Sequence, residues 1–242
     1  MKKKFFNKRM LINVFPQLFF FYDKLKTNYN NKRNYTLIRI PKTATTKLHQ
    51  LIKEVEILSN LIDLPHHNIR IYHLQKNDKF ILPLRNPIQR MQSAFYYEVQ
   101  KIDGSDFFIL EFLFTKIKDF NNFCEWLYSF NPLKYLSSRL YFYTGYHMQD
   151  TLYSYFISKT SREPFHIIEQ EEFEKDFLDL CNKLKVQNSL VNELNIKNPI
   201  NFGNYKEKGL SKLALKNINR FLSKDMSIYN SLLSKKKKIN SI

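Results

Sequence analysis

The stretch from Tyr35 to Thr46, YTLIRIPKTATT, contains the residues that begin the fold. Its first half is a short β-type run, rich in aromatic and branched residues, that ends at Pro41. Its second half is a loop with one lysine and three threonines, and the apolar residues after it recur at helical spacing as far as Asn60. The sequence therefore predicts a strand, a hydroxyl-rich loop and a helix over residues 45–60.

A second stretch repeats this order. Residues 79–85, KFILPLR, are another β-type run, and Pro87 suits the first position of a helix that continues to about Gln100. Strand, loop and helix repeated in this way is the pattern of a parallel sheet with helical crossovers. Ligands of such sheets bind at the carboxyl ends of the strands, where both loops lie.

The remainder of the chain is mostly helical. Residues 107–130 and 133–143 are aromatic and helical in pattern, and residues 165–168 are a third strand candidate. A strongly patterned helix follows over residues 171–184, and residues 210–233 close the fold as one or two helices. We expect an α/β fold with a central parallel sheet flanked by helices and a helix-rich C-terminal half.

Length and charge limit the domain organisation. With 242 residues and 43% hydrophobic residues, one folded domain is expected over residues 35–233. It lies between an N-terminal basic and apolar extension, residues 1–34, and a basic tail, residues 234–242. The formal charge of +17 attracts anions but does not identify them.

One apolar segment and two cysteines indicate the cellular compartment and whether a metal site is expected. Residues 10–22 are apolar but too short to span a bilayer, which needs roughly 20 apolar residues. We expect a cytoplasmic protein, with peripheral membrane contact through the N-terminal segment as the alternative. Cys124 and Cys181 are far apart and have no metal-ligand spacing, so we expect buried free thiols and no metal site.

The first loop has the composition of an anion site. Main-chain N–H groups at a helix N-terminus lack partners, and the helix dipole favours negative charge there. Lys42 adds an ammonium group, and Thr43, Thr45 and Thr46 add hydroxyl donors around Ala44. The glycines of a Walker A loop are absent. The alternative is that Thr45 only caps the helix.

The second loop offers a second anion site. Arg85 ends the second strand, and Ser93 lies eight positions later, two turns into the helix. A guanidinium and a hydroxyl placed in this way can bind one phosphate group. The alternative is a surface arginine and a serine that faces solvent.

Taken together, the two loops, Pro41-Lys-Thr-x-x-Thr46 and Arg85-x-Pro-x-x-Arg90-x-x-Ser93, resemble the paired signature of sulfotransferases. These enzymes use 3′-phosphoadenosine 5′-phosphosulfate (PAPS), and the likeness is closest to their carbohydrate-type and related bacterial branch. The resemblance implies a P-loop-like fold and transfer of a sulfuryl group to a hydroxyl, with a glycan or glycolipid as the acceptor. It also implies that the first loop, Lys42 to Thr46, binds the 5′-phosphosulfate, and that Arg85 and Ser93 bind the 3′-phosphate.

The resemblance assigns catalytic roles as well. Lys42 would stabilise charge on the bridging oxygen, and His67 would be the base that takes the proton of the acceptor hydroxyl. His66, His73 and Glu98 are alternatives for the base. The sequence also departs from the family, because Ala44 stands where a glycine is frequent and Asn86 where an aspartate is frequent.

Three other functions remain open at this stage. A nucleotide-dependent kinase would share the sheet and the anion loop but would need a Gly-rich loop and a Mg²⁺-binding Asp. A non-enzymatic basic module would bind an anionic polymer or a membrane, although no nucleic-acid motif is present and nucleic acid is disfavoured as a partner. A sulfotransferase fold without turnover is the third.

Overall fold

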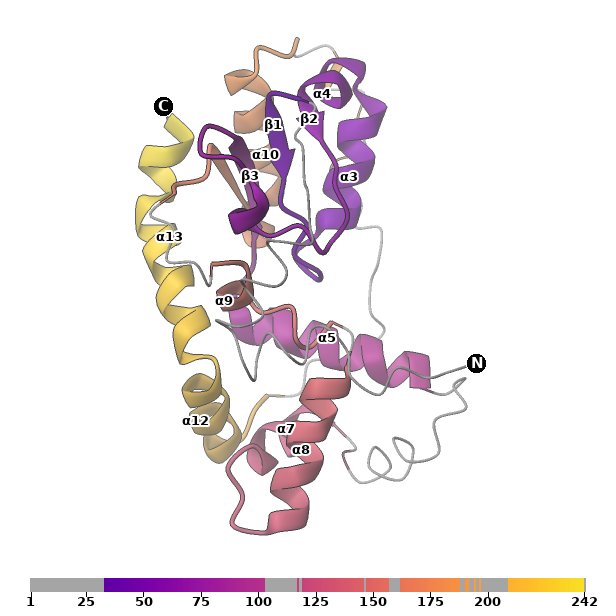
Figure 1. The fold of residues 1–242 in the computed structure, drawn as a ribbon, viewed down its shortest axis with the longest axis vertical. Helices are drawn as coiled ribbons and strands as arrows, with labels where there is room; N and C mark the ends of the chain where they lie inside the picture. Colours follow the sequence, from indigo (N-terminus) through magenta and orange to yellow (C-terminus); the bar gives the residue numbers. More distant parts are fainter. Residues whose placement is uncertain are drawn as a thin grey trace.

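The computed structural model describes residues 33–102, 117, 119–145, 147–156, 162–187, 190, 191, 194, 196 and 209–241. Four strands form an all-parallel sheet in the order β2-β1-β3-β4. Their bounds are Tyr35–Leu37 for β1, Ile62–Asp63 for β2, Lys79–Leu84 for β3 and His166–Glu169 for β4. The expected α/β fold with a central parallel sheet flanked by helices is confirmed (Figure 1). The strand β2 was not expected, because two residues are too short for a periodic signal.

The first crossover contains two helices instead of the single one that was predicted. Helix α3 spans Thr45–Glu54 and α4 spans Glu56–Leu61. Val55 separates them with extended dihedral angles, φ −104° and ψ 107°. This one extended residue ends the helical phase of α3, and Leu58 of α4 then packs in the same core as Leu48 and Ile52. Tertiary packing therefore overrides the continuous helical pattern.

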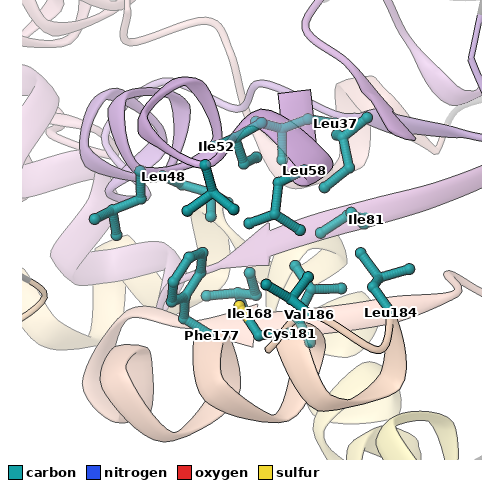
Figure 2. Close-up of a cluster of buried hydrophobic side chains, with 14 of the residues drawn as sticks. Leu37, Leu48, Ile52, Leu58, Ile81, Ile168, Phe177, Cys181, Leu184 and Val186 are labelled. Atoms are coloured by element: carbon teal, nitrogen blue, oxygen red, sulfur yellow. The ribbon is translucent and has the colours of Figure 1, made fainter. Parts of the chain in front are cut away.

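One face of the sheet packs against α3, α4 and α10, the last of which spans Phe173–Lys183. Figure 2 shows this core, in which Leu37, Ile81 and Ile168 come from three strands and Phe177 comes from α10. Successive side chains of a strand point to opposite faces of the sheet. The apolar residues next to Leu37, Ile81 and Ile168 therefore pack in a different core. Cys181 is buried here as a free thiol, and Cys124 is buried elsewhere, as expected.

The opposite face of the sheet is covered by the C-terminal helix. Helix α13 spans Ser223–Ser241 and buries Tyr229, Leu232 and Ile239 against this face. The short helix α9, Leu152–Tyr155, completes this layer. The helices on both faces bury the sheet, as parallel sheets require. The helix-rich C-terminal half is therefore confirmed.

A third core lies beyond the carboxyl ends of the strands and contains no strand. It is formed by α5 (Pro87–Ile102), α7 (Phe120–Trp126), α8 (Pro132–Thr144) and α12 (Lys212–Phe221). These helices occupy the lower half of Figure 1, below the sheet. The ring of Phe95 stacks on that of Tyr141 at 4.9 Å between centroids. Part of the helix predicted over residues 107–130 lies outside the described residues.

The prediction of a basic tail at residues 234–242 is corrected by α13, which continues as far as Ser241. The side-chain amide of Asn240 both accepts from the main-chain N–H of Ile167 and donates to its carbonyl, each at 3.0 Å. Because β4 is an edge strand, these bonds satisfy main-chain groups that no further strand pairs. The charge run is therefore anchored to the sheet instead of being solvated throughout.

The N-terminal extension, residues 1–34, lies outside the described residues except for its last two. Arg33 donates from Nη1 to the carbonyl of Ile62, the first residue of β2, at 2.7 Å. Within the described ranges, no helix is both long enough and apolar enough to cross a bilayer.

Candidate anion site at the carboxyl edge of the sheet

The two loops predicted to bind an anion are in contact. Strands β1 and β3 are parallel neighbours, so the loops after them emerge at the same edge of the sheet. Arg85, directly after β3, donates from Nη1 to the main-chain oxygen of Lys42 at 3.3 Å. Residues that are 43 positions apart in the sequence therefore form one surface.

The first loop holds two non-glycine residues in the left-handed region. The φ angles are 69° for Lys42 and 57° for Ala44. Ala44 thus adopts the conformation for which glycine is favoured, at a cost of about 1 kcal/mol. Backbone strain of this kind is concentrated at ligand-binding loops.

The N-terminus of α3 has no side-chain cap. Its N-cap is Ala44, which makes no side-chain hydrogen bond, and the first turn has no acidic residue. The alternative in which Thr45 caps the helix is therefore wrong. The first main-chain N–H groups of α3 have no side-chain acceptor from the N-cap, and the positive end of the helix dipole lies there.

The threonines of the loop divide into two kinds. Thr43 and Thr45 are buried, and both hydroxyls donate to the main-chain oxygen of Ile40, at 2.8 Å and 3.4 Å. A hydroxyl has only one hydrogen, so neither group can donate to a ligand while it makes this bond. They brace the loop, which differs from the direct role that was expected of them. Thr46 is exposed, so its hydroxyl is accessible to a ligand.

Among the described residues, two arginines at this edge have no carboxylate partner. Arg85 bonds the carbonyl of Lys42, and Arg39 bonds that of Pro65 at 3.4 Å. Within the described residues, neither forms a salt bridge, and the buried Nε of each has no hydrogen-bond partner. Burial lowers the pKa of Arg39, although Tyr155 opposes this effect. Positive charge without a carboxylate attracts a negatively charged ligand.

An aromatic side chain of α5 joins this edge to a histidine. The Lys42 ammonium lies 3.3 Å from the centroid of the Tyr97 ring, and the His147 ring lies 4.9 Å from the same ring. Ser93 is one helical turn before Tyr97, so both residues lie on the same side of α5. Ser93 is half-buried, and no hydrogen bond to Arg85 is present among the described residues. Arg85 therefore contacts the first loop, whereas Ser93 makes no hydrogen bond to Arg85 among the described residues.

His67 has the tautomer that a general base needs. Its Nδ1 lies 3.1 Å from the main-chain oxygen of Arg39, which can only accept, so Nδ1 carries the proton and Nε2 keeps its lone pair. Burial is the largest effect on the pKa of His67 and lowers it, and Arg39 and His147 act in the same direction. Its hydrogen bond to Arg39 and the charge of Asp150 raise this pKa. The ring is therefore neutral at pH 7.

Two of the alternative bases have structural partners. The Nδ1 of His73 accepts the main-chain N–H of Arg70 at 2.9 Å, and Glu98 accepts the main-chain N–H of His147 at 2.8 Å. His66 is exposed. These contacts leave His67 as the histidine with the better geometry for proton transfer.

Sequence reasoning did not find the side chains that hold His67 in place. The hydroxyl of Tyr155 lies 3.2 Å from the carbonyl of Arg39 and 3.0 Å from that of His67. Arg70 stacks over the Tyr155 ring at 3.8 Å and forms a buried ion pair with Asp150 at 2.7 Å. The partners in the Asp150 pair are 80 positions apart, and no local pattern signals the contact.

Two other features lie elsewhere. Three carboxylates near β4 have the spacing of a metal site, but the Lys236 ammonium lies 2.7–3.3 Å from all of them. A surface pocket beside α7 contains none of the predicted site residues; its lining residues are Tyr96, Asp119, Phe120, Asn121, Gly209, Leu210 and Ser211.

Comparison with known proteins gives no match. No family model matches this sequence, and no curated protein or solved structure matches the chain. Functional inference therefore depends on the residues of this site.

Proposed function

We propose that this protein transfers a sulfuryl group from PAPS to a hydroxyl acceptor, a glycan or glycolipid. The observation that carries the proposal is the contact between Arg85 and the main chain of Lys42. It joins the two loops that resemble the sulfotransferase signature, at the edge where parallel sheets bind ligands. The uncapped N-terminus of α3 lies in the same place.

The chemistry of these residues suits a nucleotide with phosphates at two positions. Lys42, the first N–H groups of α3 and the Thr46 hydroxyl would hold the 5′ end, with Thr43 and Thr45 keeping the loop in shape. Arg85 would bind the 3′-phosphate together with Ser93. The buried Arg85 Nε, which has no partner among the described residues, is a donor left for such an anion.

The proposed mechanism assigns one task to each charged group. Bound PAPS supplies a sulfuryl group on a good leaving group. The lone pair of His67 Nε2 takes the proton of the acceptor hydroxyl as that oxygen attacks sulfur. The Lys42 ammonium stabilises the negative charge that develops on the bridging oxygen. Tyr155 keeps the His67 ring in position through the carbonyl of Arg39.

The test is calorimetric titration of the purified chain with PAP, the desulfated nucleotide. We expect saturable binding by the wild type and at least a ~100-fold loss for Lys42→Ala/Arg85→Ala, because two charge-assisted contacts are removed. Arg162→Ala is the matched control, since Arg162 also bonds main-chain carbonyls, those of Leu74 and Asp78, outside this site. It should bind PAP like the wild type.

The result that would contradict the proposal is a folded wild-type protein that does not bind PAP. Binding of DNA or heparin that disappears with added salt would then support a basic binding module. If PAP binds, turnover with labelled PAPS and candidate glycans separates an active enzyme from one without turnover. His67→Ala should then lower kcat while PAP affinity stays unchanged.

A further inference from the structure

The beginning of α8 carries an exposed apolar surface. Phe130 is fully exposed, and Leu133 and Leu136 are 72% and 53% exposed. We call residues 130–136 the α8 tip. Leu133 and Leu136 are three positions apart, so they lie on one side of the helix. The connection between α7 and α8 is at the lower end of the molecule in Figure 1, away from the sheet.

The surroundings of the α8 tip are basic. The sequence has no Asp or Glu from residue 127 to 149 or from residue 210 to 224. The cations in these two stretches are Lys134, Arg139, Lys212, Lys216, Arg220 and Lys224. Glu125 of α7 is nearby, and its carboxylate accepts hydrogen bonds from Asn121 and Ser211, but the cations of the two stretches outnumber it.

One cation from each stretch lies on the same surface, whereas Lys224 lies over the Tyr153 ring of α9, at 4.6 Å from its centroid. The guanidinium groups of Arg139 on α8 and Arg220 on α12 both lie over the Tyr128 ring, at 5.4 Å and 4.5 Å from its centroid. The Lys134 ammonium lies 5.6 Å from the centroid of the Trp126 ring. Trp and Tyr prefer the boundary between lipid and water, where one side of the ring is apolar and the other is wet.

We propose that the α8 tip binds the surface of an anionic lipid bilayer. Phe130, Leu133 and Leu136 insert among the acyl chains near the head groups, and the cations of α8 and α12 contact lipid phosphates. A nucleic acid would use the same cations but would leave the three apolar side chains in water. This surface does not overlap the proposed sulfotransferase site. The membrane-binding proposal therefore does not depend on the proposed function.

The test is sedimentation of the full chain with vesicles. We expect binding to phosphatidylcholine–phosphatidylglycerol vesicles that weakens with added salt, and much weaker binding to phosphatidylcholine alone. Leu133→Ser/Leu136→Ser should lower the partition coefficient about tenfold or more, because two of the three inserted apolar side chains are lost. Both leucines are exposed, so folding should not change, and circular dichroism checks this.

Ile57→Ser is the matched control, because it removes another exposed aliphatic side chain, on α4 beside the sheet. It should bind vesicles like the wild type. Unchanged vesicle binding by the double variant would overturn the proposal and assign membrane contact to another part of the chain. A wild-type dimer in light scattering that the double variant converts to a monomer, without vesicle binding, would overturn it in favour of a contact between copies.

Discussion

Two cations at neighbouring strand ends have opposite surroundings. Arg85 follows Leu84 of β3, and Leu84 is paired in the sheet with Glu169 of β4, which Lys236 contacts. Arg85 has a main-chain carbonyl as its partner, whereas Lys236 lies among the carboxylates of Glu169, Glu172 and Asp176. Lys236, whose charge is neutralised by these carboxylates, holds parts of the fold together. The charge of Arg85 can instead attract an anion.

The electrostatics around Lys236 fit a structural role. Its hydrogen bonds to Asp176 and Glu169 raise the pKa of Lys236 against the opposing effect of burial. Burial raises the pKa of Asp176, and Lys236 opposes this shift. The ammonium therefore holds together like charges that would otherwise repel one another between β4, α10 and α13.

Removal of the Lys236 ammonium should have the greatest effect on stability. Lys236→Met should lower the free energy of unfolding by about 3–4 kcal/mol, because three carboxylates then lose their shared cation. Urea unfolding measures this. Lys235→Met is the matched control, since Lys235 pairs with Glu163 in solvent and should change stability by less than about 0.5 kcal/mol. Equal effects of the two variants would remove the distinction between a brace and a surface pair.

His166, which bonds the main-chain carbonyl of Asp176, should make stability depend on pH. Burial, together with Lys183 and Lys236, lowers the pKa of His166 to about 4 from its ordinary 6.5, although its hydrogen bond to the Asp176 carbonyl opposes this. Below pH 6.5, His166 binds a proton in the unfolded chain but stays neutral in the folded chain until the pH approaches 4. Stability is therefore complete above this pH and is lost as pH falls toward 4, by about 3 kcal/mol.

His166→Gln isolates this contribution, because glutamine can also donate to the Asp176 carbonyl but does not titrate. We expect the difference in unfolding free energy between wild type and variant to change by about 3 kcal/mol between pH 7 and pH 4 in favour of the variant. Asp176 titrates in both proteins, so its contribution cancels in the difference. A difference that is constant with pH would show that His166 is not the responsible group.

Of the two cations compared, Arg85 should have the smaller effect on stability. Arg85→Met removes one hydrogen bond to a main-chain carbonyl and should change stability by about 1 kcal/mol or less. PAP at 100 times the wild-type dissociation constant should stabilise the wild type by about 2.7 kcal/mol, and the same concentration should stabilise Arg85→Met by only about 1.4 kcal/mol, because loss of one of the two charge-assisted contacts weakens binding about tenfold. Thermal unfolding with and without PAP measures both. A large loss without ligand would place Arg85 among the structural cations.

Local patterns accounted for much of the fold and for part of the site. Strands β1, β3 and β4 and the helices after the two loops were predictable, because each is a short segment with its own periodicity. Lys42 and Arg85 were predictable as neighbours, because parallel strands deliver their loops to one edge. Residues far apart in sequence, such as Asp150 and Tyr155 around His67, were not predictable in this way.

The parallel α/β architecture and the two loops at its carboxyl edge could be predicted from the amino-acid sequence, since periodicity and turn residues act over a few positions. Which cations are neutralised depends on the three-dimensional fold. Lys236 appeared as one residue of a solvated lysine run, because the sequence does not show that α13 brings it to carboxylates 60 or more positions away. Thr43 and Thr45 appeared as ligand donors, because their hydroxyl bonds to Ile40 depend on the three-dimensional form of the loop. The sequence shows which residues carry charges and hydroxyl groups, whereas the fold determines which partners those groups bond.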